Sequence, residues 1–354
     1  FEAIGLADGI SKKVVETALR KKIHVITPNK ALISKHGNYL AKIAELNNVN
    51  LEFEASVAGG TPVIKALREG LVANKVKWFA GILNGTTNYI LSKMTDENSS
   101  FEDALKQAQN LGLAEADPTM DVDGTDAAQK ASILSALAFN TPFDFSSVAY
   151  GGIEKISSDD ILYAEQLGYS IKHIAYGSIE NGEVNVSAYP TFVSKDQLLS
   201  QVGQQMNALE IYCEDIGSTV YYGPGAGPKP TASAVIADLV DISNGGWPVL
   251  DNNSKKNKFS KQGNEKFSRY FNLEVKNEAG AIAKVSSLFA QKDISIEALI
   301  QKESKQNIDP QNYVPVVIIS GKISDLQALA MLKDIESMEE INKSVKQFRI
   351  HNAI

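Results

Sequence analysis

Residues 14–30 read VVETALRKKIHVITPNK, and this stretch decides the class of fold. Its first half places apolar residues on one face at helical spacing: Val14, Val15, Ala18 and Leu19. Its second half is a short β-branched run, 23–26, that ends at a proline. A second helix around 39–46 leads into a second strand at 49–55. Alternation of helix and strand predicts a parallel α/β sheet at the start of the chain.

The pattern changes after about residue 56. Up to about residue 200, strand-like runs at 76–83, 173–179 and 184–192 mix with helical patterns at 64–69, 101–111 and 126–139. This mixture predicts an α+β unit in which helices cover a mostly antiparallel sheet. A strand at 218–222 then precedes an amphipathic helix, which we expect to return to the first unit.

The C-terminal third divides into a spacer and a compact unit. Residues 243–266 are rich in Asn, Lys, Ser and Gly, which predicts a linker or exposed loop. Residues 267–354 then show the order βαββαβ, which is typical of a ferredoxin-like unit. We expect its strands at 270–275, 294–301, 314–320 and 345–350, and its helices at 281–291 and 326–335.

Composition restricts the function classes. The 354 residues are 44% hydrophobic and 22% charged, as in ordinary folded proteins, and the net charge of -7 disfavours a basic surface for nucleic acid or anionic lipid. No apolar run approaches the roughly 18–20 residues of a membrane span. The single cysteine, Cys213, excludes an internal disulfide and favours a reducing, cytoplasmic location. Its strand-like flank predicts a buried side chain.

The densest group of ionisable residues is LGLAEADPTMDVDGTDAAQK at 111–130. A calcium-binding loop is excluded here, because placing Asp121, Asp123 and Gly124 at positions three, five and six puts Lys130 at position twelve, where an acid is required. The four histidines are not spaced for a zinc site either.

Asp126 and Lys130 are four residues apart, so both project from one face of a helix. One interpretation is a surface ion pair worth about 0.3–0.5 kcal/mol. The other is a site in which carboxylates hold a substrate ammonium group and the lysine transfers a proton. The second requires burial or a nearby cation, because a lysine with its ordinary pKa of about 10.4 is a poor base. Lys30, at the carboxyl end of a strand, is such a cation or an ordinary loop residue.

Three further turns fit a ligand or a purely structural role. EASVAGGTP at 54–62 ends a strand in glycines, which suits a tight turn or backbone contacts to an ion. NGTTN at 84–88 caps a helix or binds a polar group. GPGAGP at 223–228 joins a strand to a helix without the spacing of the dinucleotide-binding fingerprint.

Six segments in this order resemble the homoserine dehydrogenases of the monofunctional type, over residues 1–242. They are TPNK at 27–30, EASVAGGTP at 54–62, GILNGTTNYIL at 81–91, LGLAEADPTMDVDGTDAAQK at 111–130, GGIEKIS at 151–157 and GPGAGPKPTASAV at 223–235. The resemblance implies reversible reduction of aspartate 4-semialdehyde to homoserine with NADP or NAD, in threonine and methionine biosynthesis.

The resemblance also implies roles for single residues. Lys130 corresponds to the proton donor and acceptor at the substrate oxygen, and Lys30 to the lysine beside nicotinamide and substrate. Glu115 corresponds to the residue that holds homoserine, with Asp121 and Asp126 as further acids. Gly223 would lie against the cofactor. A structural sodium ion would be held by Glu54, Val57, Gly59 and Thr61.

The implied domains are the remainder of a Rossmann domain at 1–55, rejoined by about 201–242, and a substrate-binding and dimerisation domain at 56–200. After the linker at 243–266, residues 267–354 resemble an ACT domain. Family members begin with a strand, a GxGxxG loop and a helix, so we expect the start of the Rossmann domain to be missing before Phe1. ACT domains bind amino acids at a seam between copies, which implies threonine as an effector and a homodimer or homotetramer. The competing hypothesis is a catalytically inactive homologue that binds amino acids as a regulatory dimer.

Overall fold

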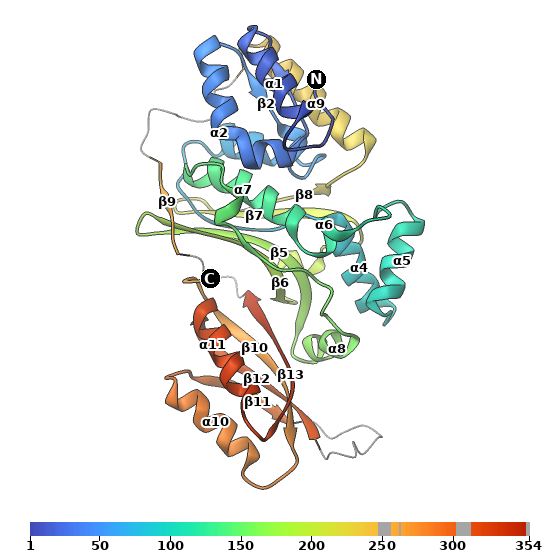
Figure 1. Ribbon diagram of the computed structural model, residues 1–354, viewed down its shortest axis with the longest axis vertical. Coiled ribbons are helices and arrows are strands. Elements are labelled where there is room, and N and C mark those ends of the chain that lie inside the picture. The colour runs from blue at the N-terminus through green and yellow to red at the C-terminus, as the bar shows by residue number, and fades with distance from the viewer. Residues whose placement is uncertain (247–255, 262, 302–312, 352–354) are drawn as a thin grey trace.

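The computed structural model describes residues 1–246, 256–261, 263–301 and 313–351. Three tiers follow one another along its long axis (Figure 1): an N-terminal group of helices, a central sheet with helices beside it, and a C-terminal unit. No helix in the ranges described is both long and apolar enough to cross a membrane.

The N-terminal tier confirms the alternation of helix and strand. Helices α1 (Ile10–Arg20) and α2 (Lys30–Asn47) precede the parallel strands β1 (Val25–Ile26) and β2 (Leu51–Glu52) in the order α1-β1-α2-β2. The predicted strand at 49–55 is too long, because residues 54–56 form a 3₁₀ helix. There the Ser56 N–H donates to the carbonyl of Phe53 instead of to a neighbouring strand.

The central sheet has the order β6-β5-β3-β7-β8, with antiparallel neighbours throughout. Its strands are β3 (Val76–Ile82), β5 (Tyr169–Glu180), β6 (Glu183–Ser194), β7 (Met206–Cys213) and β8 (Gly217–Pro224). Two short strands, β4 (Ala149–Tyr150) and β9 (Lys258–Phe259), pair with β6 in parallel. Cys213 is fully buried at the end of β7, as its alternating flank predicts.

The predicted return of residues 201–242 to the first domain is wrong for the two strands. β7 and β8 belong to the central sheet, because β7 pairs with β3 along nearly its whole length. Only α9 (Pro228–Ser243) lies beside the N-terminal tier (Figure 1), where the carboxylate of Asp238 accepts a hydrogen bond from the Glu54 N–H at 3.0 Å.

Helix α7 (Thr125–Phe139) lies between the N-terminal tier and the central sheet (Figure 1). Small residues let neighbours approach it closely on several sides, among them Ala127, Ala128, Ala131, Ser132 and Ser135, all buried. The remaining helices of this part are α3 (Val63–Lys65), which continues as a π turn over Ala66–Gly70, α4 (Gly85–Asp96), α5 (Phe101–Asn110), α6 (Thr119–Val122) and α8 (Ser158–Gln166).

The C-terminal unit has the predicted βαββαβ order. Its elements are β10 (Lys266–Lys276), α10 (Ala281–Gln291), β11 (Ile296–Gln301), β12 (Tyr313–Ser324), α11 (Asp325–Glu336) and β13 (Ile341–His351). The strand order β11-β12-β10-β13 continues into the central sheet, because β13 pairs in parallel with β6, where Arg349 faces Thr191.

The predicted linker at 243–266 is only partly a linker. Residues 258–259 form β9 on the edge of β6, and Lys266 already belongs to β10. Residues 247–255 and 262 lie outside the described part of the chain. The C-terminal unit is joined to the rest by more than a spacer, since one apolar core includes Phe192 of β6, Tyr270 of β10 and Phe348 of β13.

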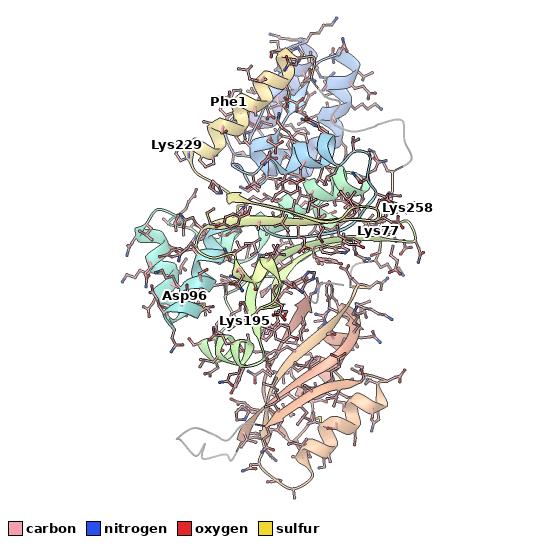
Figure 2. All side chains as sticks on the ribbon, turned by 180° about the vertical axis from the view of Figure 1, so that it is seen from behind. Phe1, Lys77, Asp96, Lys195, Lys229 and Lys258 are labelled. Atoms are coloured by element: carbon pink, nitrogen blue, oxygen red, sulfur yellow. The ribbon has the colours of Figure 1, made fainter. Side chains whose placement is uncertain are left out.

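Many charged side chains project from the surface, as Figure 2 shows for Asp96, Lys195 and Lys229. Asp126 differs sharply from these, because it is only 5% exposed. A buried carboxylate needs charged or hydrogen-bonding partners, and these partners define the candidate site.

Candidate active site

The candidate site forms where α2, the end of β3, α6 and α7 meet. Asn29 accepts a hydrogen bond from the Leu32 N–H and thereby begins α2, which puts Lys30 in the first turn of that helix. Gly124, in a left-handed conformation at φ 90°, begins α7. A side chain at Gly124 would lie 2.9 Å from the carbonyl of Gly151, so glycine is required there.

Asp126 lies between the two lysines singled out from the sequence. Its Oδ1 is 3.1 Å from Lys30 Nζ, and its Oδ2 is 2.8 Å from Lys130 Nζ. Burial by itself would raise the pKa of Asp126, but Lys130 and Lys30 outweigh burial and hold the pKa well below its usual range. The carboxylate is therefore charged at any physiological pH.

Lys30 lies beside the same carboxylate as a second cation. The nearby charge of Asp126 raises the pKa of Lys30 above its usual value, against the opposing effect of burial. The two ammonium groups do not face each other directly, because a carboxylate lies between them. Lys30 is therefore a fixed cation at neutral pH.

Lys130 is held from two directions. Besides its ion pair with Asp126, its Nζ donates to the carbonyl oxygen of Leu83 at 2.6 Å, at the end of β3. Its side chain is 12% exposed, against 20% for Lys93 in the pair Lys93–Glu97 and 56% for Arg20 in the pair Arg20–Glu16, both of which have the same i,i+4 spacing. The interpretation of Asp126 and Lys130 as an ordinary surface ion pair is therefore wrong.

Asn84 joins two of the acids. Its amide nitrogen donates to Asp121 Oδ1 and to Asp126 Oδ2, both at 2.8 Å, while its oxygen accepts from the Thr87 N–H and caps α4. Burial raises the pKa of Asp121, and the hydrogen bond from Asn84 opposes that change. NGTTN therefore both caps a helix and contributes to the site, two roles that the sequence left open.

Glu115 is placed differently from the other acids. Its side chain is exposed on the loop between α5 and α6, and its charge contributes to the raised pKa of Lys30. The site thus combines one buried carboxylate between two lysines with two acids, Asp121 and Glu115, nearer to solvent.

The glycine-rich end of β8 and the loop that follows it lie against the turn at 57–61. The Gly60 N–H donates to the carbonyl of Pro224 at 2.9 Å, and a side chain at Gly223 would lie 3.0 Å from Thr61 Oγ1. A side chain at Gly225 would collide with Asn207, whose amide nitrogen donates to the carbonyl of Leu83 at 3.0 Å. Sequence reasoning missed Asn207, because its partner is 124 positions away and no motif surrounds it.

In the turn predicted to hold sodium, the carboxylate of Glu54 binds backbone N–H groups. Both carboxylate oxygens of Glu54 accept backbone hydrogen bonds, from Ile64 at 3.1 Å and from Lys65 at 2.9 Å, at the start of α3. Thr61 Oγ1 is buried and has no hydrogen-bond partner among the residues described. The same described residues contain no cluster of three or more acidic, histidine or cysteine side chains that would hold a metal ion.

Comparison with known proteins assigns the family. Residues 62–240 match the family "Homoserine dehydrogenase", and residues 269–337 match the ACT domain. A homoserine dehydrogenase of Neisseria gonorrhoeae is 40% identical over 97% of this chain and 80% of its own length. The chain belongs to the homoserine dehydrogenase family. It is accordingly an NAD(P)-dependent oxidoreductase with a C-terminal ACT domain.

Solved structures agree with this assignment. A homoserine dehydrogenase from Thiobacillus denitrificans superposes with a TM-score of 0.92 at 36% identity and covers 99% of this chain and 81% of that one. A hyperthermophilic archaeal homoserine dehydrogenase in complex with NADPH superposes with a TM-score of 0.59 at 30% identity, over 67% of this chain and 69% of that one. The predicted combination of an α/β part, an α+β part and an ACT domain is confirmed.

Proposed function

We propose that the protein interconverts L-homoserine and L-aspartate 4-semialdehyde, with NADP or NAD as cofactor, in threonine and methionine biosynthesis. The observation that carries the proposal is the Lys30–Asp126–Lys130 arrangement at the end of β3. Bound NAD(P)H supplies the hydride for reduction, and the protein supplies charge, orientation and a proton.

Lys130 is the proposed proton donor to the aldehyde oxygen, and the acceptor from the hydroxyl in the reverse direction. Its Nζ is fixed by Asp126 and by the Leu83 carbonyl, so the ammonium group is oriented before substrate binds. Lys30 is proposed to lie beside both nicotinamide and substrate as a permanent positive charge. Since Asp126 already binds both lysines, we assign it the task of orienting them.

Glu115 and Asp121 are the proposed partners of the substrate ammonium group. The charges of both act on Lys30, and both side chains are more exposed than Asp126, so an incoming cation can reach them. Asn84 holds Asp121 and Asp126 at a fixed distance from each other. In this arrangement the acids select an amino substrate and the lysines act on its distal oxygen.

The glycine loop fits a bound nicotinamide cofactor. Gly223 and Gly225 present no side chains, and the buried Asn207 Oδ1 next to them has no hydrogen-bond partner among the described residues. We propose that Gly223 and Lys30 contact the cofactor, and the NADPH complex of the archaeal relative favours NADPH.

Sodium is proposed at the turn of Glu54, Val57, Gly59 and Thr61. The buried, unpartnered Thr61 Oγ1 supports this, since an alkali cation prefers such neutral oxygens together with backbone carbonyls. Melting temperatures in NaCl and in choline chloride at equal ionic strength test it. Wild type is expected to melt higher in NaCl, and Thr61→Val to lose most of that difference; equal values in both salts for wild type would refute the site.

Threonine is the proposed effector of the ACT domain, in a dimer or tetramer, at the seam between two copies near Gly280, the residue just before α10. Initial rates measured with increasing L-threonine, and with D-threonine as the control, test this. Inhibition by the L-isomer alone is expected, and identical curves for the two isomers would contradict it. The inactive-regulator hypothesis is not favoured, because Lys30, Asp126 and Lys130 form a complete set.

Substrate selection gives the direct test of the proposed function. Homoserine oxidation is followed through NADPH or NADH formation, with 4-hydroxybutyrate as the control that lacks the ammonium group. We expect kcat/KM to be at least ~10²-fold higher for homoserine, since the unpaired acids would be left without a cation. Asp121→Asn should lower the ratio of kcat/KM for homoserine to kcat/KM for 4-hydroxybutyrate. Equal kcat/KM values for both substrates in wild type would refute the proposed binding of the ammonium group.

A further inference from the structure

A second cleft lies away from the lysines, where the ACT domain meets the central part of the chain. One wall comes from α11 and β13, and the other from the loop over residues 151–155 and from Tyr189 and Pro190 of β6. Its volume is about 380 Å³. This lies within the range of roughly 300–1,000 Å³ that small-molecule sites occupy.

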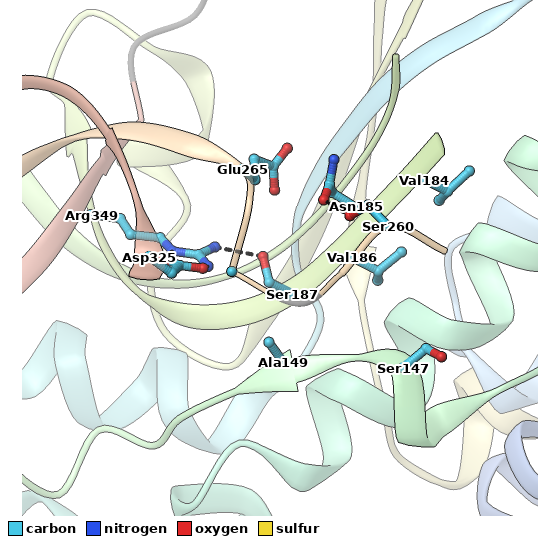
Figure 3. Close-up of a pocket in the computed structure, with 11 residues that line it drawn as sticks. Ser147, Ala149, Val184, Asn185, Val186, Ser187, Ser260, Glu265, Asp325 and Arg349 are labelled. Atoms are coloured by element: carbon cyan, nitrogen blue, oxygen red, sulfur yellow. Dashed lines mark hydrogen bonds and ion pairs between the residues drawn. The ribbon is translucent and has the colours of Figure 1, made fainter. Parts of the chain in front are cut away.

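Two arginines form the inner end of this cleft and share one acid. Arg349 donates through Nε and Nη2 to the carboxylate of Asp325 and through Nη1 to Ser187 Oγ (Figure 3). Arg269, only 2% exposed, donates to the same Asp325 and to Gln347, and its Nε has no partner among the residues described. Burial, and then the nearby charge of Arg349, lower the pKa of Arg269 to about 10.

The nearby acid Glu265 does not neutralise the second arginine. Glu265 is hydrogen-bonded to Ser178 and makes no ion pair with either arginine in the described part of the chain; Figure 3 shows it beside the Arg349–Asp325 pair. Burial raises the pKa of Glu265 to about 7, so at neutral pH it carries only part of a negative charge. Among the described residues, both buried guanidinium groups pair with the single carboxylate of Asp325, and Arg269 Nε is left without a partner, so this end of the cleft can accept an anion.

The outer part of the cleft is apolar on one side and charged on the other. Leu329 of α11 is 56% exposed, and Leu332 and Val345 lie beside it in the lining. Lys155 and Glu154 are both exposed at the rim. A ligand that fits the arginines at the inner end and the apolar side has an anionic head and a compact apolar body.

We propose that this cleft binds a small organic carboxylate, with its carboxylate toward Arg269 and Arg349 and a branched apolar body against Leu329 and Val345. The site is separate from the proposed substrate site. Its loop wall packs on the active-site side, because the Ile153 N–H donates to the carbonyl of Val122 at 2.9 Å, just before Asp123. Binding does not depend on the proposed function, whereas any effect on turnover does.

Calorimetric titration of the full chain with 4-methylpentanoate, without cofactor or substrate, tests the proposal. We expect a dissociation constant on the order of 1 mM, as for a ligand of this size. The neutral isostere 4-methylpentanamide should bind at least ~10-fold more weakly, because it cannot pair with the arginines. Equal affinity for the acid and the amide would overturn the proposal.

Two exposed leucines of α11 provide a matched pair of variants. Leu329→Glu places a carboxylate in the cleft and should weaken binding at least ~10-fold, whereas Leu326→Glu, 54% exposed and outside the lining, should leave it unchanged. Lys155→Glu, at the rim, should also weaken binding. If Leu329→Glu bound 4-methylpentanoate with wild-type affinity, the assignment to this cleft would be overturned. Displacement of 4-methylpentanoate by homoserine would also overturn it, because the probe would then occupy the substrate site. Failure of the proposed function would alter none of these binding results.

Discussion

At the scale of single residues, the arrangement around Asp126 can be tested by removing its charge. In Asp126→Asn the two lysines lose their shared carboxylate, so their orientation is lost and the pKa of Lys30 falls. We expect kcat/KM for homoserine to fall roughly 10²-fold. The alkaline limb of its pH profile should also move to lower pH.

The control for this variant is Glu97→Gln, which breaks the exposed i,i+4 pair with Lys93. Its activity should be unchanged. Wild-type kinetics in Asp126→Asn would show that the two lysines do not depend on this carboxylate.

Glu54 and Asp238 make stability depend on pH. Burial raises the pKa of each carboxyl group to about 7. The folded protein therefore binds more protons than the unfolded chain between about pH 4 and pH 7, so the free energy of unfolding falls as pH rises through this window. Above about pH 7 this dependence ends.

Asp238→Asn removes one of these groups and keeps an oxygen that can accept the Glu54 N–H. Urea unfolding at pH 5 and pH 8 measures how much the free energy of unfolding falls between these two pH values. This fall should be smaller in the variant than in wild type, by on the order of 2 kcal/mol. The same loss in variant and wild type would mean that Asp238 is ionised in the fold.

The charged residues of the candidate site could be predicted from the sequence, but the neutral groups that orient their side chains could not. Lys30, Asp126 and Lys130 lie in segments with recognisable local patterns, so they could be named in advance. The carbonyl of Leu83 and the amide of Asn207 belong to strands whose side chains show nothing beyond alternation. Contacts between distant segments leave no local signal, and for this reason the raised pKa of Lys30 was not predicted.

At the scale of elements, the loop over residues 151–157 sets the position of α6. A side chain at Gly152 would lie 2.1 Å from the Val122 carbonyl oxygen and 2.6 Å from the Asp123 Cα, both backbone atoms. Gly152→Ala should therefore displace the segment that carries Asp121 and lower kcat/KM for homoserine at least ~10-fold. Gly70→Ala, with nothing within 4 Å of the added carbon, is the control. Equal kinetics in both variants would show that the contact is not required.

Periodicity predicted the elements well where one face is buried. The six elements of the C-terminal unit and helix α7 lie within a few residues of their expected bounds. The failures come where side chains redirect the backbone. Both oxygens of Glu54 bind the start of α3, which ends the predicted strand at 49–55 early. The assignment of β7 and β8 to the wrong domain has another cause, since pairing with β3 is a non-local property.

At the scale of the whole molecule, the ACT domain and the central part share a sheet and a core. β13 continues the central sheet at β6, and the Phe192 ring lies 4.4 Å from that of Tyr270 and 5.6 Å from that of Phe348 between ring centroids. We therefore expect a single unfolding transition.

Phe192→Ala tests whether the two parts unfold together. It should lower the free energy of unfolding by about 3–5 kcal/mol and shift the whole transition to lower temperature. Phe289 lies in the ACT core against Phe271, and Phe289→Ala should lower the midpoint temperature of the same transition. Two separate calorimetric transitions, of which Phe289→Ala shifts only one, would show that the parts unfold independently.

The most direct test of the proposed chemistry is the rate of NADPH and NADH oxidation with L-aspartate 4-semialdehyde, for the purified protein and its Lys130→Ala and Lys93→Ala variants. Lys130→Ala removes the proposed proton donor and should lower kcat by about 10²–10⁴-fold. Lys93→Ala, which removes the lysine of an exposed pair with the same spacing, should keep wild-type activity. A wild type inert with both cofactors, or a Lys130→Ala variant as active as wild type, would contradict the account.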